Sequence, residues 1–304
     1  MSSARPLAPS ALAGIALAVA AVACFATLDT TTKLAAATVP LLMALWFRYC
    51  FQALMTTAVM LPQRGWSIWR TRRPGLQMLR GVLLLASSSL SFLSLKYLPV
   101  AEFTAIVSLT PLLITFMAAV VLRERVSLLR WLLVVGGFTG ALIIIRPGHD
   151  QFSWYTLLPL SVLATNTCFQ LLTSRLVRTE DPLTMHLYTG WVGMLISALA
   201  LPWVWQSLSL VEWGWLCIMG LAGAAGHFML ILAYGRAPVA TLGPYLYAQI
   251  GFAVIGGWIV FAHTPDIWSL LGMCVIAACG AAGAWLTLRE HRSLRTAVLK
   301  PIES

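Results

Sequence analysis

Ten apolar runs of about 20 residues follow one another along the chain, and this succession limits its fold more than any other feature. An α-helix needs about 20 apolar residues to cross the hydrocarbon core of a bilayer. Charged residues make up 10% of the chain, whereas a soluble globular protein carries roughly 25%. The sequence therefore predicts an all-α membrane protein with ten transmembrane helices, at residues 11–33, 40–61, 76–96, 99–122, 127–145, 154–176, 182–205, 213–234, 238–261 and 267–287.

The positive charges are distributed unevenly between the connections. With the N-terminus in the cytoplasm, sixteen Lys and Arg residues, Arg80 among them, fall in inner loops and tails, and Lys33, Lys96 and Arg146 fall outside. Cytoplasmic loops of membrane proteins carry an excess of Lys and Arg. This distribution predicts that both termini lie in the cytoplasm, and it accounts for the net charge of +10 better than nucleic-acid binding does. We expect the protein to lie in a bacterial inner membrane.

The cysteines give no sign of a disulfide framework or a metal site. All six fall within expected helices and none forms a CxxC pair, at Cys24, Cys50, Cys168, Cys217, Cys274 and Cys279. Lone cysteines in apolar helices mostly act as small packing residues. We expect no disulfide, no metal and no cofactor.

Two stretches 139 residues apart share a short pattern. "KYLPVAEFTA" begins at Lys96 and "GRAPVATLGP" at Gly235, with Glu102 of the first replaced by Thr241 of the second. Weaker matches keep the same order on both sides, which predicts two repeats at 11–148 and 149–288, between tails at 1–10 and 289–304. Five helices per repeat is an odd number, so the second repeat enters the membrane from the opposite side. Such inverted repeats, built around a central cavity, are common in secondary transporters.

The sequence resembles the ten-helix, EamA-type branch of the drug/metabolite transporter superfamily. The resemblance rests on the repeat, on "YLPVAEFTAIVSLTPLLITFMAAVVLRERVS" from Tyr97, and on "IIIRPG" at the end of the fifth run. It implies a transporter of a small metabolite whose first, third and fourth helices of each repeat line the cavity. The sequence departs from the family pattern after the ninth run, where "FAHTPD" stands in place of an acid like Glu124. That departure argues against a strictly symmetric mechanism.

Three ionisable residues of the first repeat are candidates for the site. Such residues are rare in membrane helices and usually face the bundle interior or a watery cavity. Arg48 lies about 12 Å into its helix, and Asp29 lies at a similar depth on the neighbouring run. An Asp29–Arg48 pair is either a fixed ion pair between helices or a site that binds a charged group or couples protons. Glu102 is a second partner for Arg48, or a first-turn acid that complements the helix dipole.

The second repeat offers a further set of polar candidates for substrate binding or coupling: Asn166, His227, Tyr245 and Gln249. Tyr245 and Gln249 are four residues apart, so a continuous helix would place them on one face. Pro244 and Pro111 predict kinks in the two corresponding helices. Packing is the competing interpretation for Asn166 and His227, while His186 and the serines of run 76–96 are expected to serve the interface and packing.

The motifs favour transport over the other classes of function. The chain has no H-E-x-x-H, G-x-S-x-G or P-loop, so an intramembrane enzyme and an ATP-driven pump are disfavoured. The mixture of Asp29, Arg48, Glu102 and aromatic groups favours export of amino-acid-like zwitterions by a secondary transporter. The alternative that the resemblance allows is uptake of a vitamin or nucleoside-like metabolite, such as riboflavin or S-adenosylmethionine. The expected partners are the small-molecule substrate, protons, the lipid bilayer and a second copy of the chain.

Overall fold

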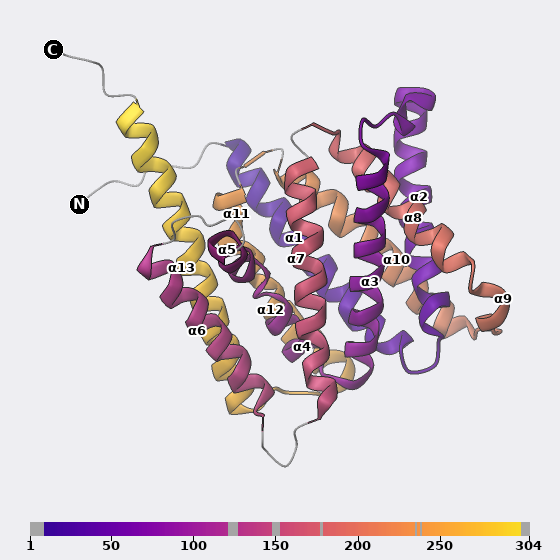
Figure 1. Ribbon diagram of the computed structural model, residues 1–304. Helices are drawn as coiled ribbons and strands as arrows, with labels where there is room; N and C mark the ends of the chain where they lie inside the picture. Colours follow the sequence, from indigo (N-terminus) through magenta and orange to yellow (C-terminus); the bar gives the residue numbers. More distant parts are fainter. Residues whose placement is uncertain are drawn as a thin grey trace.

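The computed structural model describes residues 9–120, 127–147, 153–176, 179–234, 236–237 and 239–298, and this part of the chain is helical without a strand. The helices form one bundle (Figure 1). Their bounds are α1 Pro9–Ala35, α2 Leu41–Arg64, η1 Gly65–Trp69, α3 Pro74–Tyr97, α4 Val100–Val107, α5 Thr110–Val120, α6 Leu128–Ile145, η2 Trp154–Leu157, α7 Leu158–Leu176, α8 Pro182–Ala198, α9 Leu201–Val204, α10 Leu210–Tyr234, α11 Val239–Leu246, α12 Ala248–Phe261 and α13 Ile267–Val298.

Each expected apolar run coincides with one helix or with two consecutive helices of the described part. Seven helical spans there are long and apolar enough to cross a membrane by length and composition. Three runs fall short of that measure. Arg48 and Gln52 lower the hydropathy of α2, a break divides α4 from α5, and α8 ends after 17 residues. The fold is that of an α-helical membrane protein.

Two helices are interrupted at corresponding positions. α4 and α11 are both eight residues long, and each begins and ends 139 residues from the other. The regular α-helical pattern is then interrupted by a turn at Ser108 and Leu109 in one case and at Tyr247 in the other, while Ser108 and Tyr247 keep αR backbone angles. Pro111 follows the first break, and Pro244 precedes the second. A proline ring removes a backbone donor and clashes with the preceding turn, so kinks were expected at both places.

The bundle is assembled from helices that are far apart in the sequence. α1 packs against α10, α3 against α7, α2 against α8, and α6 against α13. The last pair lies side by side in Figure 1. Their close approach depends on glycine, because a Cβ at Gly140 would lie 2.8 Å from the carbonyl oxygen of Gly272. Small residues permit such contacts between membrane helices.

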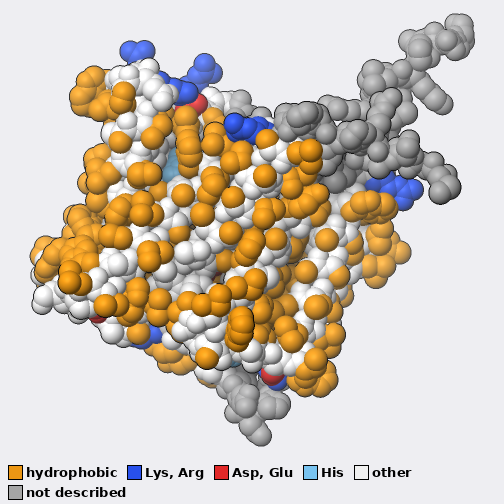
Figure 2. Space-filling view, turned by 180° about the vertical axis from the view of Figure 1, so that it is seen from behind, with side chains coloured by type: hydrophobic (Ala, Val, Ile, Leu, Met, Phe, Trp, Pro, Cys, Tyr) orange, Lys and Arg blue, Asp and Glu red, His pale blue; other side chains and the backbone are white. Residues whose placement is uncertain are grey.

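The surface of the bundle is apolar over a broad face. Figure 2 shows hydrophobic side chains across this face, with Lys and Arg gathered toward its edges. Large exposed apolar side chains include Trp66, Trp154, Trp203 and Leu210, which lie at or near helix ends. Exposed apolar surface of this extent suits contact with lipid, and tryptophans at helix ends suit the interface between lipid and water.

Candidate functional site

Asp29 joins the two interrupted helices. Its carboxylate accepts a hydrogen bond from Thr104 Oγ1 of α4 at 3.4 Å and one from Gln249 Nε2 of α12 at 3.2 Å. Thr104 lies four residues before the break at Ser108, and Gln249 lies two residues after the break at Tyr247. One carboxylate from α1 is therefore bonded to both interrupted helices, next to the turn that interrupts each of them.

Arg48 does not form the expected ion pair with Asp29. Its Nη1 donates to Ser88 Oγ of α3 at 2.7 Å, and its guanidinium lies 5.4 Å from the centre of the Tyr49 ring. Its Nε is buried and has no hydrogen-bond partner. The expectation rested on α1 and α2 being neighbours in the bundle, whereas α1 packs mainly against α10 and α12. Arg48 thus remains a cation without an acidic partner within 4.0 Å in the described residues.

The expected shared face of Tyr245 and Gln249 is also absent. Tyr245 is 39% exposed, while Gln249 points at Asp29. The prediction assumed a continuous helix, and the break at Tyr247 lies between the two residues. Tyr247 is the tyrosine that points inward: it is buried, packs against Gly280, and its hydroxyl has no hydrogen-bond partner. The sequence analysis left Tyr247 out of the candidate site because a residue of the turn follows no helical spacing.

Asn166 contacts the other break. Its Nδ2 donates to Thr110 Oγ1 at 3.3 Å, and Thr110 is the first residue of α5. Thr110 in turn donates to the backbone carbonyl of Val107, the last residue of α4. Asn166 therefore stabilises the turn between α4 and α5, which agrees with its interpretation as a polar contact between helices.

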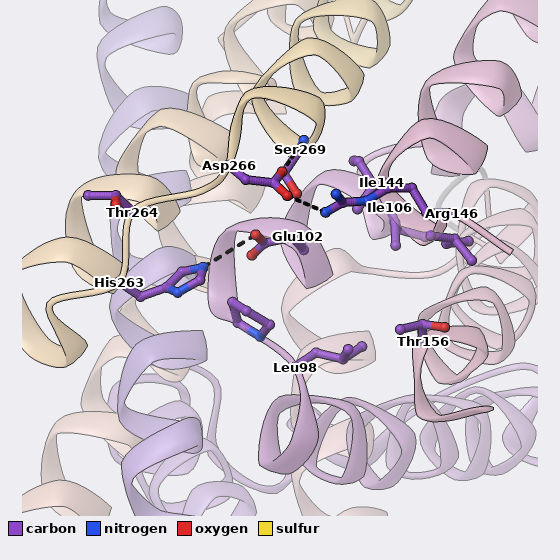
Figure 3. Close-up of a pocket in the computed structure, with 12 residues that line it drawn as sticks. Leu98, Glu102, Ile106, Ile144, Arg146, Thr156, His263, Thr264, Asp266 and Ser269 are labelled. Atoms are coloured by element: carbon purple, nitrogen blue, oxygen red, sulfur yellow. Dashed lines mark hydrogen bonds and ion pairs between the residues drawn. The ribbon is translucent and has the colours of Figure 1, made fainter. Parts of the chain in front are cut away.

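Glu102 lies in a cavity at the end of the bundle where α1 finishes. The cavity has a volume of about 270 Å³, and Figure 3 shows Glu102 and His263 facing each other across it. Glu102 Oε1 lies 3.3 Å from His263 Nε2, and its other oxygen is buried without a partner. Glu102 was expected to contact Arg48, but its partner belongs to the connection between α12 and α13. Glu124, the other acid discussed from the sequence, lies outside the described residues.

An ion pair also lines the same cavity. Arg146 follows α6 in a left-handed conformation, with φ of 48°, and its side chain pairs with Asp266 (Figure 3). Asp266 also accepts a hydrogen bond from the backbone N–H of Ser269 at 2.7 Å and so caps the start of α13. Burial acts to raise the pKa of Asp266, but hydrogen bonds from Ser269 and Arg146 outweigh it and hold this pKa below its ordinary value of 3.8.

His227 belongs to a polar cluster that the sequence analysis did not assemble. Its ring packs edge-on against Phe25 at 4.8 Å and against His186 at 5.9 Å, between ring centres. His186 is buried, and its Nδ1 lies 3.1 Å from Gln52 Nε2. His186 was interpreted as interfacial and Gln52 was passed over. The spacing of four residues between Arg48 and Gln52 was the signal that placed both on one face of α2.

The serines of α3 divide into two kinds. Ser91 and Ser94 donate to backbone carbonyls one turn earlier, as expected of packing residues. Ser88 differs because its hydroxyl contacts Arg48 and Tyr49. Among the described residues, no group of three or more His, Cys, Asp or Glu lies close enough to hold a metal ion.

The comparison with known proteins identifies the family. The model of the EamA-like transporter family matches residues 12–146, close to the first expected repeat. A riboflavin transporter of Rhizobium johnstonii is 30% identical over 237 residues, which make up 77% of this chain and 77% of that protein. The chain belongs to the EamA-like transporter family. The resemblance to the drug/metabolite transporter superfamily is thereby confirmed.

Other EamA-like relatives extend over more of the chain. A riboflavin transporter of Brucella anthropi is 29% identical over 92% of this chain and 100% of its own length. The pseudopaline exporter CntI of Pseudomonas aeruginosa is 25% identical over 88% of this chain and 94% of its own. A solved crystal structure with 19% identity superposes with a TM-score of 0.64 and covers 91% of this chain and 98% of that one, which supports the fold alone. The names of the family and of these relatives indicate a multi-pass membrane transporter of bacteria and not an enzyme.

Proposed function

We propose that this EamA-like protein is a secondary transporter that moves a small metabolite across the inner membrane by alternating access. The observation that carries the proposal is the position of Asp29, which is bonded to both interrupted helices. Interrupted helices in membrane proteins occur where backbone lines a cavity or is buried in protein, and transporters use them at their substrate and ion sites. A change at Asp29 therefore acts on both helices at once.

The packing supports two inverted repeats of five helices. If α1 corresponds to α7 and α3 to α10, exchanging the repeats turns the contact of α1 with α10 into that of α7 with α3, and both contacts are present. The same exchange turns the contact between α2 and α8 into itself, and likewise the contact between α6 and α13. Both of these contacts are also present. The equal lengths of α4 and α11 fit the same relation. Two halves related in this way are able to exchange conformations and open the centre to alternate sides.

We orient the bundle with the Arg64–Asp181 contact in the cytoplasm. Those two residues end α2 and precede α8, and Glu180 beside them accepts hydrogen bonds from Thr71 Oγ1 and the backbone of Arg72. The excess of Lys and Arg falls on this side, as the positive-inside rule requires. The first turn of α1 and the last turns of α13 lie at the same end in Figure 1, which puts both helix ends in the cytoplasm. The Glu102 cavity then faces outward.

The charges of the core favour a zwitterionic cargo. Asp29 suits an ammonium group, and Arg48 suits a carboxylate because its Nε lacks a partner. His227 and Gln249 add neutral polar contacts beside them. We infer export of an amino-acid-like metabolite as the primary activity, and the exporter among the relatives supports this direction.

Uptake of a vitamin is the second candidate. Two relatives with 29% and 30% identity are named riboflavin transporters, and one of them is matched over its whole length. A flavin ring is amphipathic and stacks on aromatic side chains. The buried hydroxyl of Tyr247, which has no partner among the described residues, is available to hydrogen-bond such a ring.

Coupling to protons completes the proposal. A carboxylate that accepts hydrogen bonds from Thr104 and Gln249 loses acceptor capacity when it is protonated. Protonation of Asp29 therefore weakens the link between α4 and α12 and permits the two to move apart. Glu102 and its contact with His263 control access from the outer side.

A transport assay tests both cargo classes together. The full chain is reconstituted in proteoliposomes, and a panel of labelled amino acids, riboflavin and nucleosides is followed with and without an imposed pH gradient. Saturable flux of one class that responds to the gradient is expected. If no member of the panel crosses faster than in empty vesicles while the protein chemically converts one of them, the transporter proposal is wrong.

A further inference from the structure

Arg80 is a buried cation without an acidic partner. It lies on α3, is 8% exposed, and stacks 4.7 Å from the centre of the Phe169 ring. Its Nε donates to Thr173 Oγ1 of α7 at 2.7 Å, and its Nη1 donates to the backbone carbonyl of Met185 and to Thr189 Oγ1 on α8. No carboxylate lies within 4.0 Å of it among the described residues. The sequence analysis had counted Arg80 with the loops because it follows the basic segment before α3.

Polar groups beside Arg80 also lack partners. Gln77 lies one turn earlier on the same face of α3 and is 0% exposed, and within the described part of the chain neither its Nε2 nor its Oε1 has a hydrogen-bond partner. His186 follows Met185 on α8, and its Nε2 is buried without a partner. The interface between α3 and α8 therefore holds the positive charge of Arg80, which no carboxylate balances, and the buried amide of Gln77. No group in the described part of the chain accepts a hydrogen bond from that amide.

The energetics require an explanation. An unpaired buried amide costs about 1–3 kcal/mol, and a buried charge costs more unless it is paired. Hydrogen bonds to neutral oxygens orient the Arg80 guanidinium, but they do not balance its charge. Well-packed apolar side chains often replace buried ionic groups without loss of stability, so stability alone does not account for Arg80 and Gln77. A ligand that supplies negative charge and acceptor oxygens would satisfy Arg80 and Gln77 together.

We propose that Arg80 and Gln77 form a subsite for an anionic group, a carboxylate or a phosphate, of the transported metabolite. This inference rests on the proposed function and narrows its substrate class to metabolites that carry at least one anionic group. The guanidinium fork matches the planar oxygens of a carboxylate or phosphate. The subsite lies toward the cytoplasmic end in the proposed orientation, where α3 and α8 are closed together, while the cavity beside Glu102 is at the other end. The anion therefore enters when α8 moves away from α3.

Ligand binding to the full chain tests the subsite without a transport assay. The protein is placed in nanodiscs of neutral phosphatidylcholine, and thermal unfolding is followed by tryptophan fluorescence at constant ionic strength. Succinate and inorganic phosphate are the anionic probes, and succinamide is the uncharged counterpart of succinate. We expect a saturable rise of the unfolding midpoint with both anions and none with succinamide.

Variants assign the effect to the subsite. Arg80→Gln removes the charge and is expected to raise the half-saturating succinate concentration at least about tenfold. Gln77→Leu removes the unpaired amide, so we expect the unfolding midpoint without ligand to stay the same or rise. The same variant is expected to bind succinate several-fold more weakly. Arg236→Gln removes the same charge from an exposed arginine and is expected to leave binding unchanged. If Arg80→Gln does not fold, Gln77→Leu decides.

Three results overturn the proposal. The first is an equal response to succinate and succinamide, and the second is wild-type succinate binding by the folded variants. The third is found in nanodiscs that contain phosphatidylglycerol: this lipid raises the unfolding midpoint, and succinate then has no further effect. That result would assign the site to a lipid headgroup. A flat anion titration with intact flux in proteoliposomes refutes the subsite alone. Anion binding without flux of any panel member refutes the transport proposal alone.

Discussion

Gln249 donates a hydrogen bond to the carboxylate of Asp29 across 220 residues of sequence, at 3.2 Å. The contact connects α1 to α12, just beyond the break at Tyr247. Thr104 on α4 shares the same carboxylate oxygen. A single acid of α1 is therefore bonded to a residue beside each of the two breaks.

Replacing Gln249 by leucine tests the strength of that contact. Gln249→Leu leaves the Asp29 carboxylate with Thr104 as its remaining donor, and we expect a loss of about 1–3 kcal/mol of stability if Asp29 stays ionised. The thermal unfolding midpoint in nanodiscs measures this. Adding Asp29→Asn to Gln249→Leu should cost less than the sum of the two single changes, because the residues act as a pair. Strict additivity would show that they do not interact.

Gly280 tests the packing at the second break. The Tyr247 ring lies against this glycine, so Gly280→Ala forces the ring to move and is expected to destabilise the protein by about 1–3 kcal/mol. Gly251 on α12 is the matched control, since nothing lies within 4 Å of a Cβ added there. Gly251→Ala should be neutral or stabilise by up to about 1 kcal/mol. Equal effects of the two changes on the unfolding midpoint would contradict the close contact at the break.

Asp266 gives a prediction for pH. Its pKa is held below the ordinary value of 3.8, so the stability that it contributes is fully present above that value and is lost as the pH falls through the folded-state pKa. The difference in unfolding midpoint between wild type and Asp266→Asn should therefore be constant from pH 8 to about 5 and shrink only in stronger acid. Because the pair with Arg146 is partly exposed, about 0.5 kcal/mol is expected.

The two functions of Asp266 are separated by a second substitution. Asparagine retains an oxygen that caps α13, whereas alanine does not, so Asp266→Ala should cost about 1 kcal/mol more than Asp266→Asn. A difference that changes between pH 8 and 6 would indicate that another group, and not Asp266, controls this end of the bundle.

Glu102 is expected to matter for substrate entry. Glu102→Gln removes the charge that faces His263 and leaves a side chain of equal size, which should raise the apparent KM for substrate from the outer side several-fold with little change in stability. Glu212→Gln is the control, because Glu212 is an exposed acid that contacts Ser209 at the start of its own helix. An unchanged KM for both variants would assign Glu102 to helix capping alone.

The positions of the helices could be read from the sequence because lipid imposes length and hydropathy on each span. The break before Pro111 could also be predicted, since proline acts on its own turn. The partners of Asp29 could not be predicted, because chain order suggests that α1 lies against α2. In the structure α1 packs mainly against α10 and α12.

The burial of individual polar residues was the other property that the sequence did not predict. Arg80 follows the basic segment Arg70–Arg73 and was counted with it, yet it lies about two helical turns into α3, where it contacts α7 and α8. Tyr247 is buried because it occupies a turn, and no helical period marks it. Asp29 and Arg48 were recognised as unusual from composition alone, since charge inside a membrane helix is rare.

Transport driven by a pH gradient tests the role of Asp29 most directly. Proteoliposomes with wild type or Asp29→Asn are loaded with the substrate identified by the panel, and flux is measured with and without the gradient. Asp181→Asn, which changes an acid at the start of α8, is the control. We predict that Asp29→Asn abolishes gradient-driven accumulation, whereas exchange of labelled for unlabelled substrate continues at a reduced rate because the ammonium contact is also weakened. Accumulation at the wild-type rate by Asp29→Asn would contradict the account.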